Sequence, residues 1–167
     1  MRGLHVAASG VGLGIVAIAL AWTAGAQSTS ANIFVRNQTG GSSYLVSVVN
    51  KGAALESSER SEVSIELVDL VPPGVTVTHI NAAQPWACAP LAPLPALPLT
   101  GPGAISCTFK VQVGSSIATS VLLPQITISF TGGPKNKSCV AGRLFRVEGG
   151  STKLVTETNL NDNYACI

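Results

Sequence analysis

The stretch VSIELVDLVPPGVTVTHI, residues 63–80, decides the fold of this chain. From Val63 to Leu67, apolar residues alternate with polar ones, which is typical of a β-strand with one buried face and one wet face. Pro72-Pro73-Gly74 ends this strand, because proline cannot donate to a β-ladder and glycine permits a tight turn. The alternation resumes at Val75, so the stretch predicts two strands joined by a turn.

Short β-branched runs separated by turn residues continue on both sides of this stretch, without a sustained apolar period of about 3.6 residues. Further strands are expected at residues 32–36, 44–49, 105–113, 121–131, 144–148 and 153–156, the last two as a hairpin across Gly149-Gly150. About eight short strands favour an all-β antiparallel sandwich, because two facing sheets bury their apolar sides without helices.

A proline-rich run, PLAPLPALPLTGP at residues 90–102, is expected to stay outside the sheets and to be extended and at least partly solvated. It carries Leu91, Leu94, Leu97 and Leu99, the most distinctive apolar feature of the chain. Because such a segment has already lost part of its ordering entropy, it is a candidate contact site for a partner. The alternative is a flap or spacer that covers the domain.

The first 26 residues have the pattern of a cleavable secretory signal peptide. Arg2 supplies the positive start, residues 11–22 form an uncharged apolar run, and Ala24-Gly25-Ala26 offers a cleavage site before Gln27. The apolar run is shorter than the roughly 20 residues that a membrane-spanning helix needs. We therefore expect one mature domain, residues 27–167, that is secreted, periplasmic or on the cell surface, without membrane insertion.

The charged residues of the predicted mature chain exclude several classes of function. Without Arg2, nine basic residues face eight acidic ones, and nucleic-acid binding needs a clustered basic face instead. His79 is the only histidine left to serve as a general base, and Ser106 lacks a G-x-S-x-G elbow. We therefore expect no catalytic residue, no cofactor and no enzyme activity; an enzyme would need a pocket around His79.

Four cysteines, Cys88, Cys107, Cys139 and Cys166, favour two disulfides in an exported chain. Of the three possible pairings, Cys88–Cys107 and Cys139–Cys166 are favoured, because each pair flanks a single loop-like excursion. A zinc site is the alternative, although no C-x-x-C knuckle is present.

The order of several motifs resembles a bacterial surface repeat module of the immunoglobulin-like class, the domain of unknown function eleven family. The motifs are an alternating strand ending in N-x-G, then D-x-L-P-x-G, W-x-C, a second cysteine and an asparagine-rich finish. In this chain they are YLVSVVNKG (44–52), DLVPPG (69–74), WAC (86–88), Cys107 and NLNDNYA (159–165).

The resemblance spans residues 33–165 and implies an immunoglobulin-like antiparallel β-sandwich of about 7–9 strands. It also implies an extracellular or cell-surface role without catalysis. The proline-rich run lengthens the loop between the first two cysteines, and the pair Cys139 and Cys166 is additional to the usual pattern. Such modules commonly occur in tandem, whereas this chain holds one.

Three further groups of residues have two interpretations each. Trp86 either stacks on a sugar or packs on the Cys88 disulfide. The five acids between residues 56 and 69 either bind calcium or form a solvated sheet face that discourages edge pairing. The C-terminal basic residues either attract an acidic partner or carry ordinary surface charge, and they are Lys135, Lys137, Arg143 and Arg146.

Two functional hypotheses follow. The first is a secreted, non-enzymatic module of cell-surface structure, adhesion or assembly, with a protein or cell-envelope component as its partner and with self-assembly possible. The second is a secreted carbohydrate- or protein-binding, inhibitor-like domain that uses the loop of residues 90–102.

Overall fold

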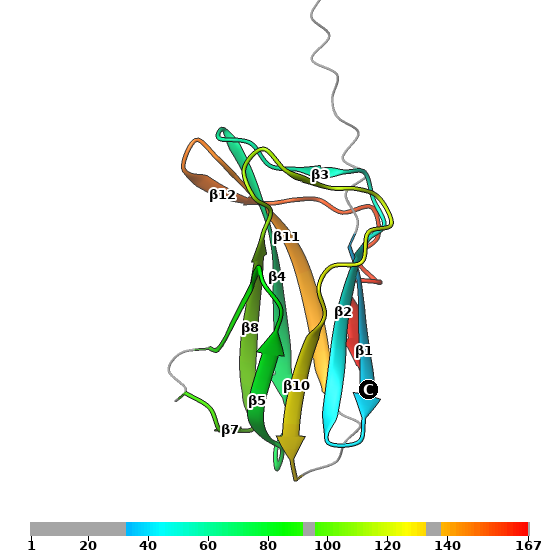
Figure 1. Ribbon diagram of the computed structural model, residues 1–167, viewed down its shortest axis with the longest axis vertical. Helices are drawn as coiled ribbons and strands as arrows, with labels where there is room; N and C mark the ends of the chain where they lie inside the picture. The colour runs from blue at the N-terminus through cyan, green and yellow to red at the C-terminus, as the bar shows by residue number, and fades with distance from the viewer. Residues whose placement is uncertain (1–32, 92–95, 133–137, 167) are drawn as a thin grey trace, which may run out of the picture.

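The computed structural model describes residues 33–91, 96–132 and 138–166, and its strands form antiparallel sheets that pack on a shared core (Figure 1). The predicted signal peptide lies outside the described residues. All thirteen strands of the described part are paired antiparallel or lie in antiparallel sheets, which confirms the predicted all-β sandwich. The strand count is higher than expected because it includes five strands of only two to four residues. The immunoglobulin-like topology stays a prediction.

One layer is a five-stranded sheet in the order β1-β2-β10-β5-β7. Its strands are β1 (Ile33–Gly40), β2 (Ser43–Asn50), β10 (Ile126–Thr131), β5 (Thr76–Ala82) and β7 (Leu99–Thr100). A β-bulge interrupts the pairing of β10 with β5 between Ser129 and Phe130.

The other layer is a six-stranded sheet in which β12-β11-β4-β8-β6 are neighbours and β13 pairs with β11. Its strands are β12 (Ser151–Leu154), β11 (Cys139–Glu148), β4 (Ser61–Val71), β8 (Gly103–Lys110), β6 (Trp86–Pro90) and β13 (Tyr164–Cys166). A separate pair, β3 (Leu55–Glu56) with β9 (Ser116–Ile117), lies near one end of the sandwich (Figure 1).

The stretch of residues 63–80 supplies one strand to each layer, as β4 and β5. Val63, Ile65 and Leu67 are buried in the shared core, which confirms their predicted face. The turn between the strands is closed by the Val75 amide, which donates to the Pro72 carbonyl oxygen at 3.2 Å. This corner therefore carries the chain from one sheet to the other.

The prediction that the proline-rich run stays outside the sheets is wrong at both ends. Pro90 ends β6 opposite Ile105, and β7 pairs with Thr76–Val77 of β5. Because β6 is an edge strand, the missing N–H of Pro90 removes no interior ladder bond. At Gly101, a Cβ atom would overlap the backbone of Val71 and Pro72, so glycine lets the run return close to the corner.

Other strand boundaries also differ from the expectations. The strand expected at 121–131 begins only at Ile126, and β11 begins at Cys139, ahead of the expected 144. The hairpin across Gly149-Gly150 is confirmed, with β12 at Ser151–Leu154.

Asn50 is a fully buried amide that holds the end of β2 against the loop after β9. Its Nδ2 donates to the carbonyl oxygens of Ala53 at 2.9 Å, Ile117 at 3.0 Å and Ala118 at 3.2 Å. Its Oδ1 accepts from the Gly52 amide at 3.1 Å. One side chain therefore satisfies four backbone groups at this end of the sandwich.

Replacing Asn50 by Ala is expected to lower the free energy of unfolding by about 2–3 kcal/mol, because buried backbone groups lose their partners. Urea unfolding followed by circular dichroism measures the change. The matched control is Thr119→Ala, whose hydroxyl donates to the Gly52 carbonyl oxygen at 2.8 Å from an exposed position. The control should cost less than about 1 kcal/mol, and equal losses would contradict the assigned role of Asn50.

Candidate functional site

Both favoured disulfide pairings are confirmed. Cys88–Cys107 joins register partners on β6 and β8, and Cys139–Cys166 joins register partners on β11 and β13. Because all four cysteines are in disulfides, none of them is left as a thiolate that could bind zinc. Two disulfides are compatible with an extracellular or otherwise oxidising environment.

Trp86 is buried, with 3% of its surface exposed, so it does not form the exposed sugar platform that was one of its two interpretations. Its ring meets the ring of Phe109 edge-on at 5.1 Å between centroids. Its Nε1 donates to the Pro124 carbonyl oxygen at 2.6 Å. The alternation of β6 turns Trp86 into the core, two register pairs away from the Cys88–Cys107 pair.

The four leucines of the proline-rich run do not share one exposed surface. Leu99 is buried, with 1% exposed, and Leu97 packs partly buried against the core, so these two leucines do not form the candidate contact site. Leu94 lies outside the described residues. Leu91 is exposed (38%), and its amide donates to the Ala104 carbonyl oxygen at 3.0 Å. Pairing of β7 with β5 pulls the end of the run into the core.

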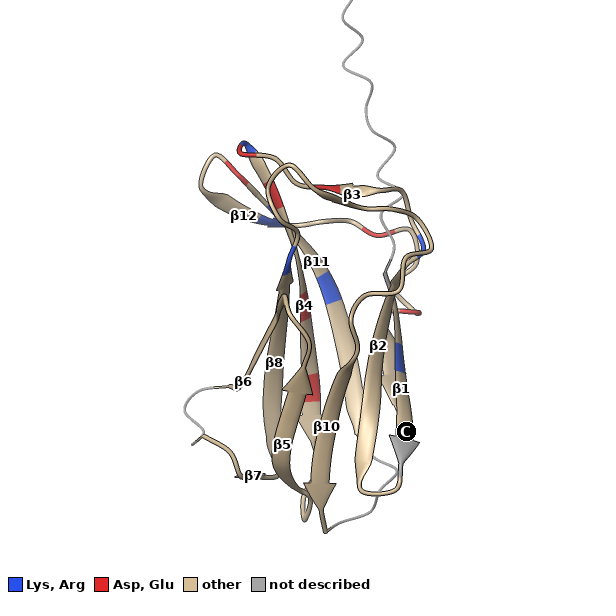
Figure 2. Cartoon of the chain, in the orientation of Figure 1, with Lys and Arg blue, Asp and Glu red and all other residues tan. Residues whose placement is uncertain are grey.

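The acidic residues between 56 and 69 do not converge on one point. Glu62 is exposed and Glu66 half-buried on the outer face of β4, as predicted, whereas Asp69 is buried on the inner face. Within the described ranges, no group of three or more His, Cys, Asp or Glu residues is arranged to hold a metal ion. Figure 2 shows both acidic and basic residues of the described part near β3 and β12.

The other charged candidates lie apart. His79 is exposed on β5 opposite Ser129, and the groove described below does not include it. Arg146 donates to the Ser61 hydroxyl at 2.7 Å, while Arg143 is exposed on the outer face of β11. Lys135 and Lys137 lie outside the described residues.

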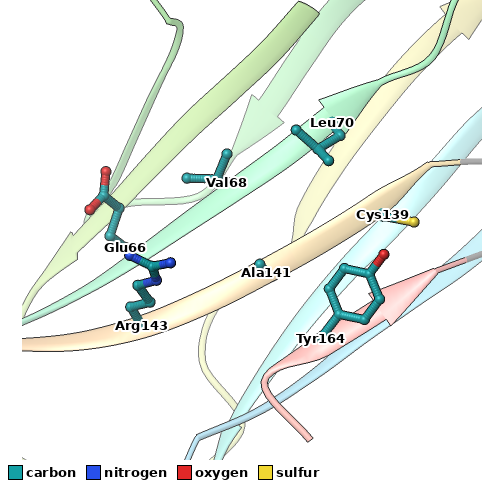
Figure 3. A pocket seen from close by; sticks show the side chains of 7 residues that line it. All are labelled: Glu66, Val68, Leu70, Cys139, Ala141, Arg143 and Tyr164. Carbon is teal, nitrogen blue, oxygen red and sulfur yellow. The ribbon is translucent and has the colours of Figure 1, made fainter. Parts of the chain in front are cut away.

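A mainly apolar groove lies on the outer face of the six-stranded sheet (Figure 3). We call it the β4–β11 groove, and its volume is about 380 Å³. Leu70 is 52% exposed and Tyr164 is 54% exposed, and both line this groove. Its lining residues are Glu66, Val68 and Leu70 from β4, Cys139, Ala141 and Arg143 from β11, and Tyr164 from β13.

The groove arises because the polar and apolar residues of β4 exchange faces after Leu67. Its inner face carries an acid at Asp69, and its outer face carries the apolar Val68 and Leu70. The sequence alternation predicts a wet outer face made of Ser64, Glu66 and Val68. The triplet Val68-Asp69-Leu70, which reverses the polarity of the alternation, was the available signal for this exception.

Beneath the groove, a buried polar network joins the two sheets. The Asp69 carboxylate is 3% exposed and accepts hydrogen bonds from the Tyr44 hydroxyl and, at 2.8 Å, from the Ser138 hydroxyl. Nδ2 of Asn37 donates to the Ser138 hydroxyl at 3.4 Å. The network thus ties β1 and β2 of one sheet to β4 and to the residue that precedes β11 in the other.

Burial raises the pKa of Asp69 to about 6, although the hydrogen bonds from Tyr44 and Ser138 partly offset that rise. Burial and the neighbouring Asp69 charge raise the pKa of the Tyr44 phenol well above its usual range. The tyrosine therefore stays a hydroxyl donor. Since Val68 and Leu70 flank Asp69 and Cys139 follows Ser138, the network also fixes the two strands that carry the groove.

No family model, curated protein or solved structure matches this chain. The resemblance to the immunoglobulin-like surface module therefore stays a prediction. Over residues 33–91, 96–132 and 138–166, none of the structure is a helix of the length and apolarity that crossing a membrane requires.

Asp69 is expected to make the protein less stable as pH rises from 4 to 7. Because its pKa is about 6 in the folded state against 3.8 for the ordinary group, the folded state binds the extra proton in this window. The stabilisation is complete below about pH 4 and is lost as pH rises through 6, by up to about 3 kcal/mol. Urea unfolding at several pH values measures it.

The variant Asp69→Asn cannot ionise and should flatten this pH dependence. Glu66→Gln, on the other face of the same strand, is the control and should keep the wild-type slope. An unchanged slope in Asp69→Asn would contradict the assignment.

The two disulfides should open in a fixed order under mild reduction. Cys166 is exposed and Cys139 half-buried, whereas Cys107 is buried, so a reductant reaches the Cys139–Cys166 bond first. Trapping with iodoacetamide followed by peptide mass spectrometry should show label on Cys139 and Cys166 before the other pair. Earlier labelling of Cys88 and Cys107 would refute this order.

Proposed function

We propose that this protein is a secreted, non-enzymatic adhesion or assembly module that binds a protein partner through the outer face of its six-stranded sheet. The observation that carries the proposal is the β4–β11 groove, where Leu70 and Tyr164 are each more than half exposed. Contiguous exposed apolar surface rimmed by polar residues marks interaction sites in soluble proteins. Glu66 and Arg143 provide such a rim at one end (Figure 3).

The types of residue in the groove support a protein as the partner. Tyrosine and arginine are enriched among the residues that dominate binding energy at protein interfaces. Tyr164 and Arg143 supply both types here and line the groove together with the apolar Val68, Leu70 and Ala141. Leu91 extends this face. Its amide donates to the carbonyl oxygen of Ala104 on β8, and Ala104 is in turn the register partner of Leu70 on β4. One leucine of the proline-rich run thus belongs to the proposed contact surface.

The rigidity of the groove supports binding without a large ordering cost. Its strands are held by the Cys139–Cys166 disulfide and by the buried Tyr44–Asp69–Ser138 network. A surface that is already ordered loses less conformational entropy on association than a mobile loop does.

The predicted signal peptide and the two disulfides support a secreted, periplasmic or cell-surface location. The proposal also keeps the immunoglobulin-like class that the motif resemblance implies. The alternative, a carbohydrate- or inhibitor-like domain that uses residues 90–102, has less support because Trp86 and Leu99 are buried.

A capture experiment with the mature chain, residues 27–167, tests the contact surface. Leu70→Glu puts a charge into the groove and should abolish capture of the partner from the native cell envelope. Leu122→Glu is the matched control, because Leu122 is also 52% exposed but lies outside the groove. Capture that survives Leu70→Glu, or that is lost equally in both variants, would refute the proposed surface.

A further inference from the structure

We infer that the partner on the β4–β11 groove is a second copy of this chain. The two copies would meet face to face, related by a two-fold axis that runs between β4 and β11, parallel to both strands and in the plane of contact. The inference rests on the proposed function, because it takes the same groove as the contact surface and adds the identity and the orientation of the partner.

The pairing register of β4 and β11 determines which residues this axis would bring together. Glu66 lies opposite Arg143, Val68 opposite Ala141 and Leu70 opposite Cys139. Residues of one register pair lie at the same height along the strands. Each residue has a register partner on the neighbouring strand of its own chain. A two-fold axis between the strands therefore places the residue over the same partner in the other copy.

The charges of the groove are complementary under this operation. Glu66 of each copy would face Arg143 of the other, which forms two equivalent ion pairs. The guanidinium of Arg143 makes no ion pair and no hydrogen bond within the described ranges of the chain. Glu66 accepts a hydrogen bond from the Ser106 hydroxyl at 3.2 Å, which leaves its carboxylate open to a second donor. Figure 3 shows both side chains at the same end of the groove.

The side-chain sizes are complementary as well. The larger Val68 and Leu70 of β4 would face the smaller Ala141 and Cys139 of the other copy. Tyr164 on β13 pairs with Ala141, and Ser106 on β8 pairs with Val68, so both lie one strand further from the axis. The axis would therefore set Tyr164 of one copy over Ser106 of the other. Large residues opposite small ones allow two sheet faces to interdigitate at the usual spacing of about 10 Å.

A second copy explains this match better than an unrelated partner does. In a two-fold interface one patch must complement itself, so each acid needs a base and each large residue needs a small one within the same patch. An unrelated partner imposes no such relation between β4 and β11. The match across three successive register pairs therefore points to a symmetric contact.

Charge reversal followed by mixing tests this arrangement in the mature chain. Sedimentation equilibrium should show a concentration-dependent dimer for the unmodified chain. In Glu66→Arg, two arginines of one copy face two of the other, and in Arg143→Glu the same holds for glutamates. Each variant alone should dimerise at least about tenfold more weakly, because like charges are juxtaposed.

An equimolar mixture of the two variants should restore the dimer, because every facing pair is again of opposite sign. A role of these residues in folding of the single chain would give no such rescue. Lys153→Glu, which disrupts the Lys153–Glu148 ion pair outside the groove, is the control and should dimerise like the unmodified chain. If a reversed-charge variant does not fold, Glu66→Gln and Arg143→Gln replace the pair, and each should weaken the dimer about threefold.

Three results would overturn the inference. The first is a chain that is monomeric at all concentrations while its envelope capture still depends on Leu70; the proposed function then stands with a different partner. The second is a dimer that is indifferent to both charge reversals, or that the mixture does not restore. The third is a chain with neither a dimer nor Leu70-dependent capture, in which case the proposed function falls as well.

Discussion

The hydrogen bond from the Tyr44 hydroxyl to the buried Asp69 carboxylate is the interaction on which the arrangement of the two sheets depends. It is formed by β2 and β4, which belong to different layers of the sandwich. A carboxylate in this position would be costly without partners, and the two hydroxyls of Tyr44 and Ser138 satisfy it. Apolar packing is non-directional, whereas these bonds fix how far one sheet can slide over the other.

The same carboxylate accounts for the surface above it. Successive side chains of a strand point to opposite faces, so an acid that points inward at position 69 forces its neighbours Val68 and Leu70 outward. The apolar groove is thus the outer counterpart of the polar network. An interior feature that sets the relation between the sheets also creates the surface that we assign to binding.

The sequence predicted the elements whose signal is local. The alternating runs in β2, β4, β5 and β8 were recognised, and both disulfide pairs were correct because each closes one excursion of the chain. The strands β6 and β7 were missed because proline argues against a strand, although an edge position tolerates it. The first half of β11, CVAGR, lacks a β-branched alternation and is a strand because β4 and β13 pair with it on both sides. The groove could not be predicted, because its residues come from three strands whose neighbourhood is decided by non-local pairing.

The Cys139–Cys166 disulfide also has a mechanical consequence. A three-residue strand such as β13 is held by few hydrogen bonds, and a pulling force applied near Cys166 would peel it away. The disulfide passes that force directly to the start of β11, which pairs along its full ten residues with β4. The force is then carried in shear by the centre of the sheet, and the residues between the two cysteines cannot contribute their length to the extension. A module that joins surfaces under tension gains stiffness from such a covalent cross-link.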